Sequence, residues 1–281
     1  MFCSNSANLE AKCSVPFAIF TSSGQFHVPC GVHRVQVLAV GGGGGGGSGN
    51  GGGGGSGFVV ADELPVVPGR SIPVVVGDGG RGATFKVNNR SQDSQSGGSS
   101  KFDGGLVAPG GFGPYSPYEF YVGGTGGSGG GDGCNGTCLS GSGGTGGSPG
   151  FKSSISINCL PNGQGHYATN LSASRMNLLR AGSGGNGIFN QFPGGGGGGG
   201  VLLNNIGPEG NKGSDKGALG GTGFGAGGGG GFINRSSDGL TEFSHAGGNG
   251  APGLVYIMWW SDSEKVSIQP GPKLSSFIYR V

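Results

Sequence analysis

Runs of consecutive glycine limit what this chain can fold into more than any other feature of its sequence. The uninterrupted runs are residues 41–47, 51–55, 194–200 and 227–231. Glycine makes up 75 of the 281 residues, and it loses more backbone entropy on folding than any other residue. A chain this rich in glycine is usually disordered, so a folded state requires a packing arrangement that only glycine permits.

Other glycine-rich segments carry a different residue at every third position. These residues are Thr125 and Ser128; Ser142, Thr145 and Ser148; Ser183 and Asn186; and Ala246, Asn249 and Pro252. A period of three is that of the polyproline II helix, which has no internal hydrogen bonds. Such helices must pack side by side if their buried N–H and C=O groups are to be satisfied. We therefore expect packed polyglycine type II helices, with the third residues forming outward ridges and the uninterrupted runs surrounded on all sides.

Strand-like apolar runs bracket the glycine. They are residues 17–21, 25–29 and 32–40 before the first glycine run, residues 57–60, 64–67 and 72–76 after it, and residues 254–260 near the C-terminus. Short runs rich in valine and phenylalanine between turn residues are typical of β-strands, and Pro68-Gly69 predicts a turn. The best helix candidate, residues 172–180, is short.

These patterns predict a mainly β fold with almost no α-helix. A small β-sheet, built from strands at both ends of the sequence, is expected to clamp a layer of polyglycine type II helices. The organisation that follows is an irregular N-terminal lead over residues 1–16, one glycine-rich domain over residues 17–260, and a C-terminal tail over residues 261–281.

Charge and hydropathy exclude several classes of function. The net charge is +2 and charged residues make up 11% of the chain, without the basic patch that nucleic-acid binding requires. No apolar stretch approaches the length of a membrane span. Residues 1–12 also lack the apolar core of a signal peptide, which argues against ordinary secretion.

Catalytic and metal-binding patterns are weak in this sequence. Residues 146–150 match G-x-S-x-G but lack the strand-to-helix context of a nucleophile elbow, and no P-loop is present. The histidines His27, His33, His166 and His245 do not show metal-ligand spacing. We therefore expect a protein that is not an enzyme and that holds no cofactor and no metal.

A cluster of aromatic residues on a Pro/Gly-rich stretch is the strongest candidate for a binding site. Its members are Phe112, Tyr115, Tyr118, Phe120 and Tyr121. Tyrosine combines an apolar face with a polar tip and is common where proteins bind sugars or partner proteins. The alternative is that these rings cap the open side of the glycine layer.

The six cysteines are Cys3, Cys13, Cys30, Cys134, Cys138 and Cys159, and six cysteines allow fifteen pairings. Cys134 and Cys138, which share one short loop, are the favoured pair for a disulfide. A zinc site built from these two residues with Cys159 and His166 has loose spacing, so a disulfide or free thiols is the preferred interpretation.

Several stretches resemble the glycine-rich domain of phage tail-fibre adhesins and of virion proteins from large DNA viruses. They are residues 20–29, residues 32–40 running into glycines 41–47, and residues 67–80, 99–102 and 250–257. The resemblance implies layers of polyglycine helices whose tip loops bind a host. Similar domains also occur in some animal surface proteins. The six cysteines and the tail over residues 261–281 depart from the pattern of a phage tip.

The resemblance leads us to expect a non-enzymatic virion protein, either a host-surface adhesin or a minor capsid or cement component. Its partners would be other virion proteins and a host-surface glycan or protein. One alternative is an extracellular glycine-rich matrix or receptor module. A further alternative is an ice-binding protein, because flat polyglycine bundles can order water.

Overall fold

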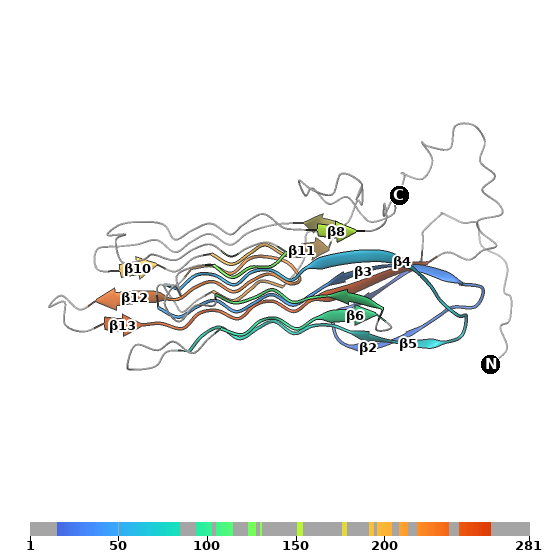
Figure 1. Ribbon diagram of the computed structural model, residues 1–281, viewed down its shortest axis with the longest axis horizontal. Coiled ribbons are helices and arrows are strands. Elements are labelled where there is room, and N and C mark those ends of the chain that lie inside the picture. Colours follow the sequence, from blue (N-terminus) through green and yellow to red (C-terminus); the bar gives the residue numbers. More distant parts are fainter. Residues whose placement is uncertain are drawn as a thin grey trace, which may run out of the picture.

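A computed structural model describes most of the glycine-rich domain, and every regular element within the described residues is a β-strand (Figure 1). The described residues are 16–49, 51–84, 94–102, 105–114, 123–127, 130, 151–153, 176–178, 191–193, 196–203, 208–212, 218–235 and 242–259. The expected mainly β fold without α-helix is therefore confirmed for these residues.

The strands near the two ends of the domain form two larger sheets. The five-stranded sheet has the order β1 (Phe17–Phe20), β14 (Leu254–Trp259), β3 (Arg34–Val40), β4 (Val59–Pro65) and β8 (Phe151–Ser153). The four-stranded sheet has the order β2 (Gly24–His27), β5 (Ser71–Val75), β6 (Ser100–Phe102) and β7 (Leu106–Ala108). All neighbouring strands are antiparallel except β4 and β8, which are parallel.

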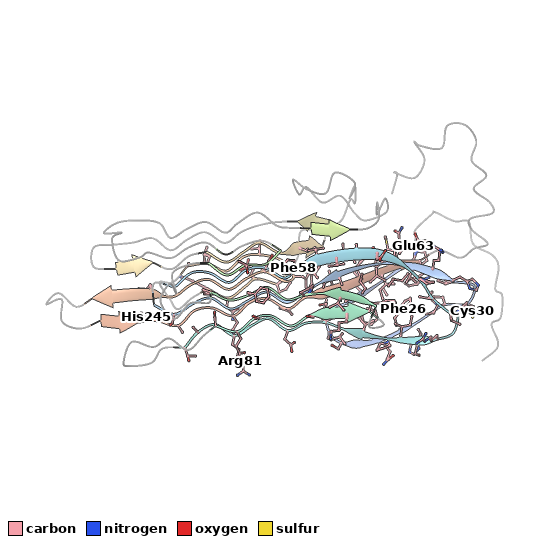
Figure 2. All side chains as sticks on the ribbon, viewed as in Figure 1. Phe26, Cys30, Phe58, Glu63, Arg81 and His245 are labelled. Atoms are coloured by element: carbon pink, nitrogen blue, oxygen red, sulfur yellow. The ribbon has the colours of Figure 1, made fainter. Side chains whose placement is uncertain are left out.

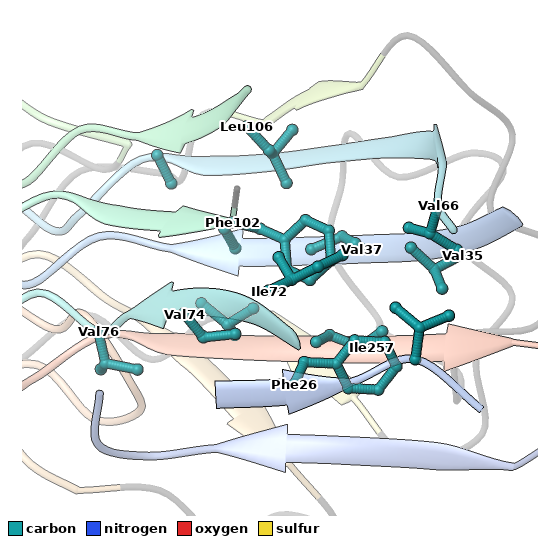
Figure 3. Close-up of a cluster of buried hydrophobic side chains, with 14 of the residues drawn as sticks. Phe26, Val35, Val37, Val66, Ile72, Val74, Val76, Phe102, Leu106 and Ile257 are labelled. Carbon is teal, nitrogen blue, oxygen red and sulfur yellow. The ribbon is translucent and has the colours of Figure 1, made fainter. Parts of the chain in front are cut away.

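Alternating side chains of the two sheets meet in one apolar core (Figure 3). Val35 and Val37 of β3 and Ile257 of β14 project into it from one sheet, and Ile72 of β5 and Phe102 of β6 from the other. Each of these side chains is at most 1% exposed, and burying one contributes roughly 1.5–3 kcal/mol. The two sheets therefore form a sandwich that the period-two pattern of the sequence explains.

Two sequence-based predictions need correction. Residues 57–60 and 64–67 were expected to be separate strands, but β4 runs without a break through the polar pair Asp62 and Glu63. Glu63 lies beside β3 and forms an ion pair with Arg34 at 2.8 Å, so the charged side chains sit at the surface of a continuous strand. In the helix candidate, residues 176–178 are instead strand β9 (Met176–Leu178), paired with β11 (Val201–Leu203).

Glycine-rich segments run from the sandwich to the opposite end of an elongated molecule (Figure 1). We call these segments the glycine body, which comprises the described parts of residues 41–58, 77–84, 94–99, 109–114, 123–130, 196–231 and 245–253. The end of the body away from the sandwich is called the distal end. It holds a small sheet of β10 (Gln191–Pro193), β12 (Phe232–Arg235) and β13 (Glu242–Ser244).

The run 41–47 lies at the centre of the glycine body, and its backbone donors change partner with a period of three. Its first, fourth and seventh N–H groups donate to Phe58, Gly55 and Gly52. The second and fifth donate to residues 98 and 95, and the third and sixth to residues 251 and 248. All seven bonds are 2.9 or 3.0 Å long. Each of the three neighbouring segments thus accepts a hydrogen bond from every third residue of the run.

The carbonyl groups of the same run accept hydrogen bonds from further segments. The oxygens of Gly43 and Gly46 accept from residues 80 and 83, and those of Gly44 and Gly47 from residues 228 and 231. The run is completely buried by these neighbours. The period of three agrees with the spacing of non-glycine residues in the sequence, while the polyglycine type II conformation of the individual segments remains a prediction.

Many positions in the interior of the body have no room for a side chain, although small residues such as Ala226 and Ser56 are buried there. A Cβ atom built on Gly43 would collide with the carbonyl of Ala226, and one on Gly197 would collide with the carbonyl of Gly227. In contrast, Thr125 and Asn249 occupy ridge positions and are exposed. The expectation that third-position residues face outward is confirmed at these two positions, whereas Ala246 and Pro252 are only partly exposed. The ridge residues Ser128, Ser142, Thr145, Ser148, Ser183 and Asn186 lie outside the described residues.

Candidate functional site

The chain enters and leaves the described domain at the sandwich end. The N–H group of Trp259, the last described residue, donates a 3.2 Å hydrogen bond to the carbonyl of Pro16, the first described residue. Between these two residues the chain runs along the glycine body in several segments and returns to the sandwich end. The distal end is therefore the part of the domain farthest from both connections to the rest of the chain (Figure 1).

The distal end is built on a turn and a stacked aromatic pair. The run 41–47 ends in a turn at which Gly49 has a φ of 63°, a conformation that side-chain-bearing residues rarely adopt. The N–H of Gly49 donates to the carbonyl of His245 at 2.8 Å. The His245 ring stacks on Phe232 with 4.0 Å between centroids and a 5° interplanar angle. Figure 2 shows His245 at the opposite end from Cys30.

One member of the predicted aromatic cluster falls within the described residues. Phe112 is 49% exposed, and its backbone is fixed on both sides, because its N–H donates to Thr125 and its carbonyl accepts from Gly55, both at 2.8–2.9 Å. Backbone bonding of this kind holds the segment in place while it leaves the ring at the surface. Tyr115, Tyr118, Phe120 and Tyr121 lie outside the described residues.

The segment that leads to the aromatic cluster approaches the distal end. A Cβ atom on Gly47, the last residue of the central run, would lie 3.2 Å from Cγ of Pro114. The segment beginning at Gly123 then returns beside the run 51–57, because Gly124 donates to Gly53. The described residues on either side of residues 115–122 therefore lie in the half of the glycine body that is nearer to the distal end.

One of the six cysteines, Cys30, lies within the described residues. Cys134 and Cys138 lie outside the described residues, so their pairing remains a prediction. Cys30 follows β2 at the sandwich end and is disulfide-bonded. The other cysteines of the chain all lie outside the described residues.

The register of the four-stranded sheet produces a polar pair that the sequence did not reveal. His27 of β2 faces Ser71 of β5, and Nδ1 of His27 lies 2.7 Å from the Ser71 hydroxyl. Both residues are exposed on the outer face of the sheet. Residues 44 positions apart in the sequence become neighbours only through strand pairing, so no local pattern could have indicated them.

Metal-binding clusters and membrane-spanning helices are both absent from the described residues. Among them, no three His, Cys, Asp or Glu side chains are grouped in a way that could hold a metal ion. The same part of the chain contains no helix that is long and apolar enough to cross a membrane.

Comparison with known proteins identifies the family. No curated protein matches the chain. A family described as "Glycine-rich domain" matches residues 21–260, which include every strand of the two larger sheets except β1 and the entire glycine body. The chain therefore belongs to the glycine-rich domain family.

Proposed function

We propose that this protein is a non-enzymatic structural component of a virus or phage particle that presents a host-binding surface at the distal end of its glycine body. The observation that carries the proposal is the pairing of Trp259 with Pro16, which puts both connections of the domain at the sandwich end. Attachment at that end leaves the distal end free to meet a host. Loops carried on a rigid scaffold are the usual place for recognition residues.

The glycine body suits this role because it is a stiff spacer that needs few side chains. Its central run is bonded to segments on all sides, and backbone packing of this density resists bending. We propose that the body is a bundle of polyglycine type II helices. A run of seven residues in that conformation spans roughly 22 Å, which separates the distal end from the sandwich.

The aromatic cluster is the proposed contact with the host. Phe112 is about half exposed, and the backbone around it leads toward the distal end. A set of tyrosines beside such a ring fits a glycan or a protein on the host surface, because aromatic faces stack on sugar rings and anchor protein interfaces.

A capsid or cement role is the second candidate, and the outer face of the four-stranded sheet favours it. Val75, Lys101 and Val107 form one row across β5, β6 and β7. The two valines are 42% and 40% exposed. A cement protein would bury such a row against neighbouring subunits, whereas an adhesin would leave it in solvent.

An extracellular module is the third candidate, and the disulfide at Cys30 favours it. Disulfides form and persist mainly in oxidising compartments and on cell or virion surfaces. A disulfide fits an exposed virion protein equally well. The location of the protein therefore has to distinguish an extracellular module from a virion protein.

Immunogold electron microscopy of the particles or cells that produce the protein tests the location. Labelling at fibre tips or vertices is the expected result. Even labelling over the capsid would replace the adhesin with the cement role, and labelling on cells alone would remove the virion proposal.

A binding assay on host surfaces tests the site. The triple variant Phe112→Ala/Tyr115→Ala/Tyr118→Ala is expected to lose at least tenfold in affinity for host cells. The matched control is Val67→Ser, which removes a 60% exposed apolar side chain from the sandwich end. Equal binding by the triple variant, the control and the wild type would reject the aromatic cluster as the contact.

A further inference from the structure

Segment 77–84 shows how an outer segment of the glycine body differs from an inner one. A Cβ atom on Gly77 or Gly80 would collide with the neighbouring segment 95–98, and a Cβ atom on Gly79 or Gly82 would collide with segment 247–251. Of the four other residues, Asp78, Arg81 and Thr84 are exposed, whereas the small side chain of Ala83 is buried. Arg81 points away from the body in Figure 2. The exposed side chains thus occupy the direction that no neighbouring glycine segment among the described residues fills.

The same outward side carries backbone groups that have no hydrogen-bond partner among the described residues. Among the described hydrogen bonds, none involves the N–H groups of Asp78 and Arg81 or the carbonyls of Gly79 and Gly82. By contrast, the carbonyls of Asp78 and Arg81 accept from Gly98 and Gln95 at 2.7 and 2.9 Å. Inside the body, equivalent donors and acceptors bind the next glycine segment. The outward side therefore has the bonding groups that a further segment would need.

Other described outer segments follow the same rule. Asn249, Phe112 and Thr125 are exposed, and each is flanked by glycines whose Cβ atoms would collide with neighbouring backbone. The inner runs 41–47 and 51–57, which neighbours surround, carry no exposed residue. Ridges of side chains therefore coincide with the lateral faces of the body.

We propose that these ridges close the lateral faces of the glycine body and that Asp78, Arg81 and Thr84 prevent a second copy of this chain from packing on segment 77–84. The physical reason is the one that excludes side chains from the interior. A Cβ atom and its substituents hold a neighbouring backbone beyond hydrogen-bonding distance, so the N–H and C=O groups beside the ridge bind water instead. Unpaired edges of β-sheets need protection for the same reason.

Removal of the ridge makes this face complementary to itself. The donors of residues 78 and 81 alternate along the segment with the acceptors of residues 79 and 82. Two such faces, related by a twofold axis, match donor to acceptor on both copies. The predicted occupant of a ridge-free face is therefore the same face of a second molecule.

The test replaces the ridge in the full chain. Asp78→Gly/Arg81→Gly/Thr84→Gly is expected to double the molar mass of the wild-type protein in light scattering coupled to size exclusion, reversibly on dilution. Hydrogen exchange at residues 78 and 81 is expected to slow in the associated form. The matched control, Asp78→Ser/Arg81→Ser/Thr84→Ser, removes the charges but keeps each Cβ atom, and it is expected to have the mass of the wild type.

Two results would overturn the proposal. An unchanged mass for the glycine variant would show that the ridge does not prevent association. Association of both variants would assign the effect to charge rather than to the Cβ atom. If thermal melting shows that the triple glycine variant is unfolded, the single variants Arg81→Gly and Arg81→Ser test the proposal instead. Only Arg81→Gly is expected to associate as the protein concentration rises.

Discussion

The hydroxyl of Ser100 donates a 2.6 Å hydrogen bond to the carbonyl of Val40 at the point where the sandwich becomes the glycine body. Ser100 begins β6 in the four-stranded sheet, and Val40 ends β3 in the five-stranded sheet. The same hydroxyl accepts from the N–H of Gly77 at 3.0 Å, and Ser100 is completely buried. One side chain of β6 therefore ties the last residue of β3 to the first residue of glycine segment 77–84.

Replacement of Ser100 by alanine is expected to reduce the free energy of unfolding by about 1–3 kcal/mol, because it leaves a buried N–H and a buried carbonyl without a partner. The measurement is chemical denaturation followed by fluorescence of the tryptophans. Ser99→Ala, at a partly exposed neighbour, serves as the control. Equal stability of both variants would contradict the assigned role.

A single methyl group in the centre of the glycine body is expected to be more harmful. The new Cβ atom of Gly43→Ala would collide with the backbone of Ala226, which cannot move aside as a flexible side chain could. A loss of at least about 3 kcal/mol is expected, at or beyond the upper end of typical overpacking costs. Thr125→Ala, at an exposed ridge position, is expected to melt within a few degrees of the wild type, and similar melting temperatures for the two variants would refute close backbone packing.

Asn249 joins two outer segments through its side chain. Its Oδ1 atom accepts a 2.9 Å hydrogen bond from the N–H of Gly82. Asn249→Ala is expected to cost about 0.5–1.5 kcal/mol and to accelerate hydrogen exchange at Gly82. Asn249→Asp retains an oxygen in that place, so slow exchange is expected to persist, and fast exchange in the aspartate variant would contradict the bond.

The disulfide of Cys30 is expected to stabilise the sandwich end. Cys30→Ser is expected to lower the free energy of unfolding by about 2–4 kcal/mol under non-reducing conditions. In reducing buffer, the variant and the wild type are expected to unfold at the same denaturant concentration. Peptide mapping by mass spectrometry identifies the partner of Cys30, and a free thiol at this position would remove the basis of the prediction.

The long strands of the sandwich could be predicted from apolar runs in the sequence, but its shortest strands could not. β3 and β14 lie within their expected ranges, because each is a long apolar run that is buried over most of its length. β6 and β7 have three residues each, too few for a period to be recognised. They become strands because β5 offers them an edge to pair with.

The candidate site was only partly visible in the sequence. Phe112 was singled out because aromatic residues gather around it, and its exposure agrees with a binding role that remains a proposal. The stack of Phe232 on His245 at the distal end was not predicted. It depends on the pairing of β12 with β13, and the two residues carry no shared pattern in the sequence.

The sequence by itself determined which residues can be inside the glycine body and which must face outward. Most interior positions have room for glycine alone, so uninterrupted runs mark the interior and an exposed third residue such as Thr125 marks a surface, although small residues such as Ala226 are also buried. This information is local, and it requires no knowledge of which segments are neighbours.

Only the tertiary structure decided which segments lie side by side. Glycine has no side chain, so the N–H of Gly43 could bond to any glycine segment, and nothing in the run itself selects Ala251. The selection comes from the sandwich, whose core fixes the order and register of its strands. β3 directs segment 41–47 outward while β14 receives segment 245–253, so packed apolar side chains at one end determine the pairing of the glycine backbone that follows.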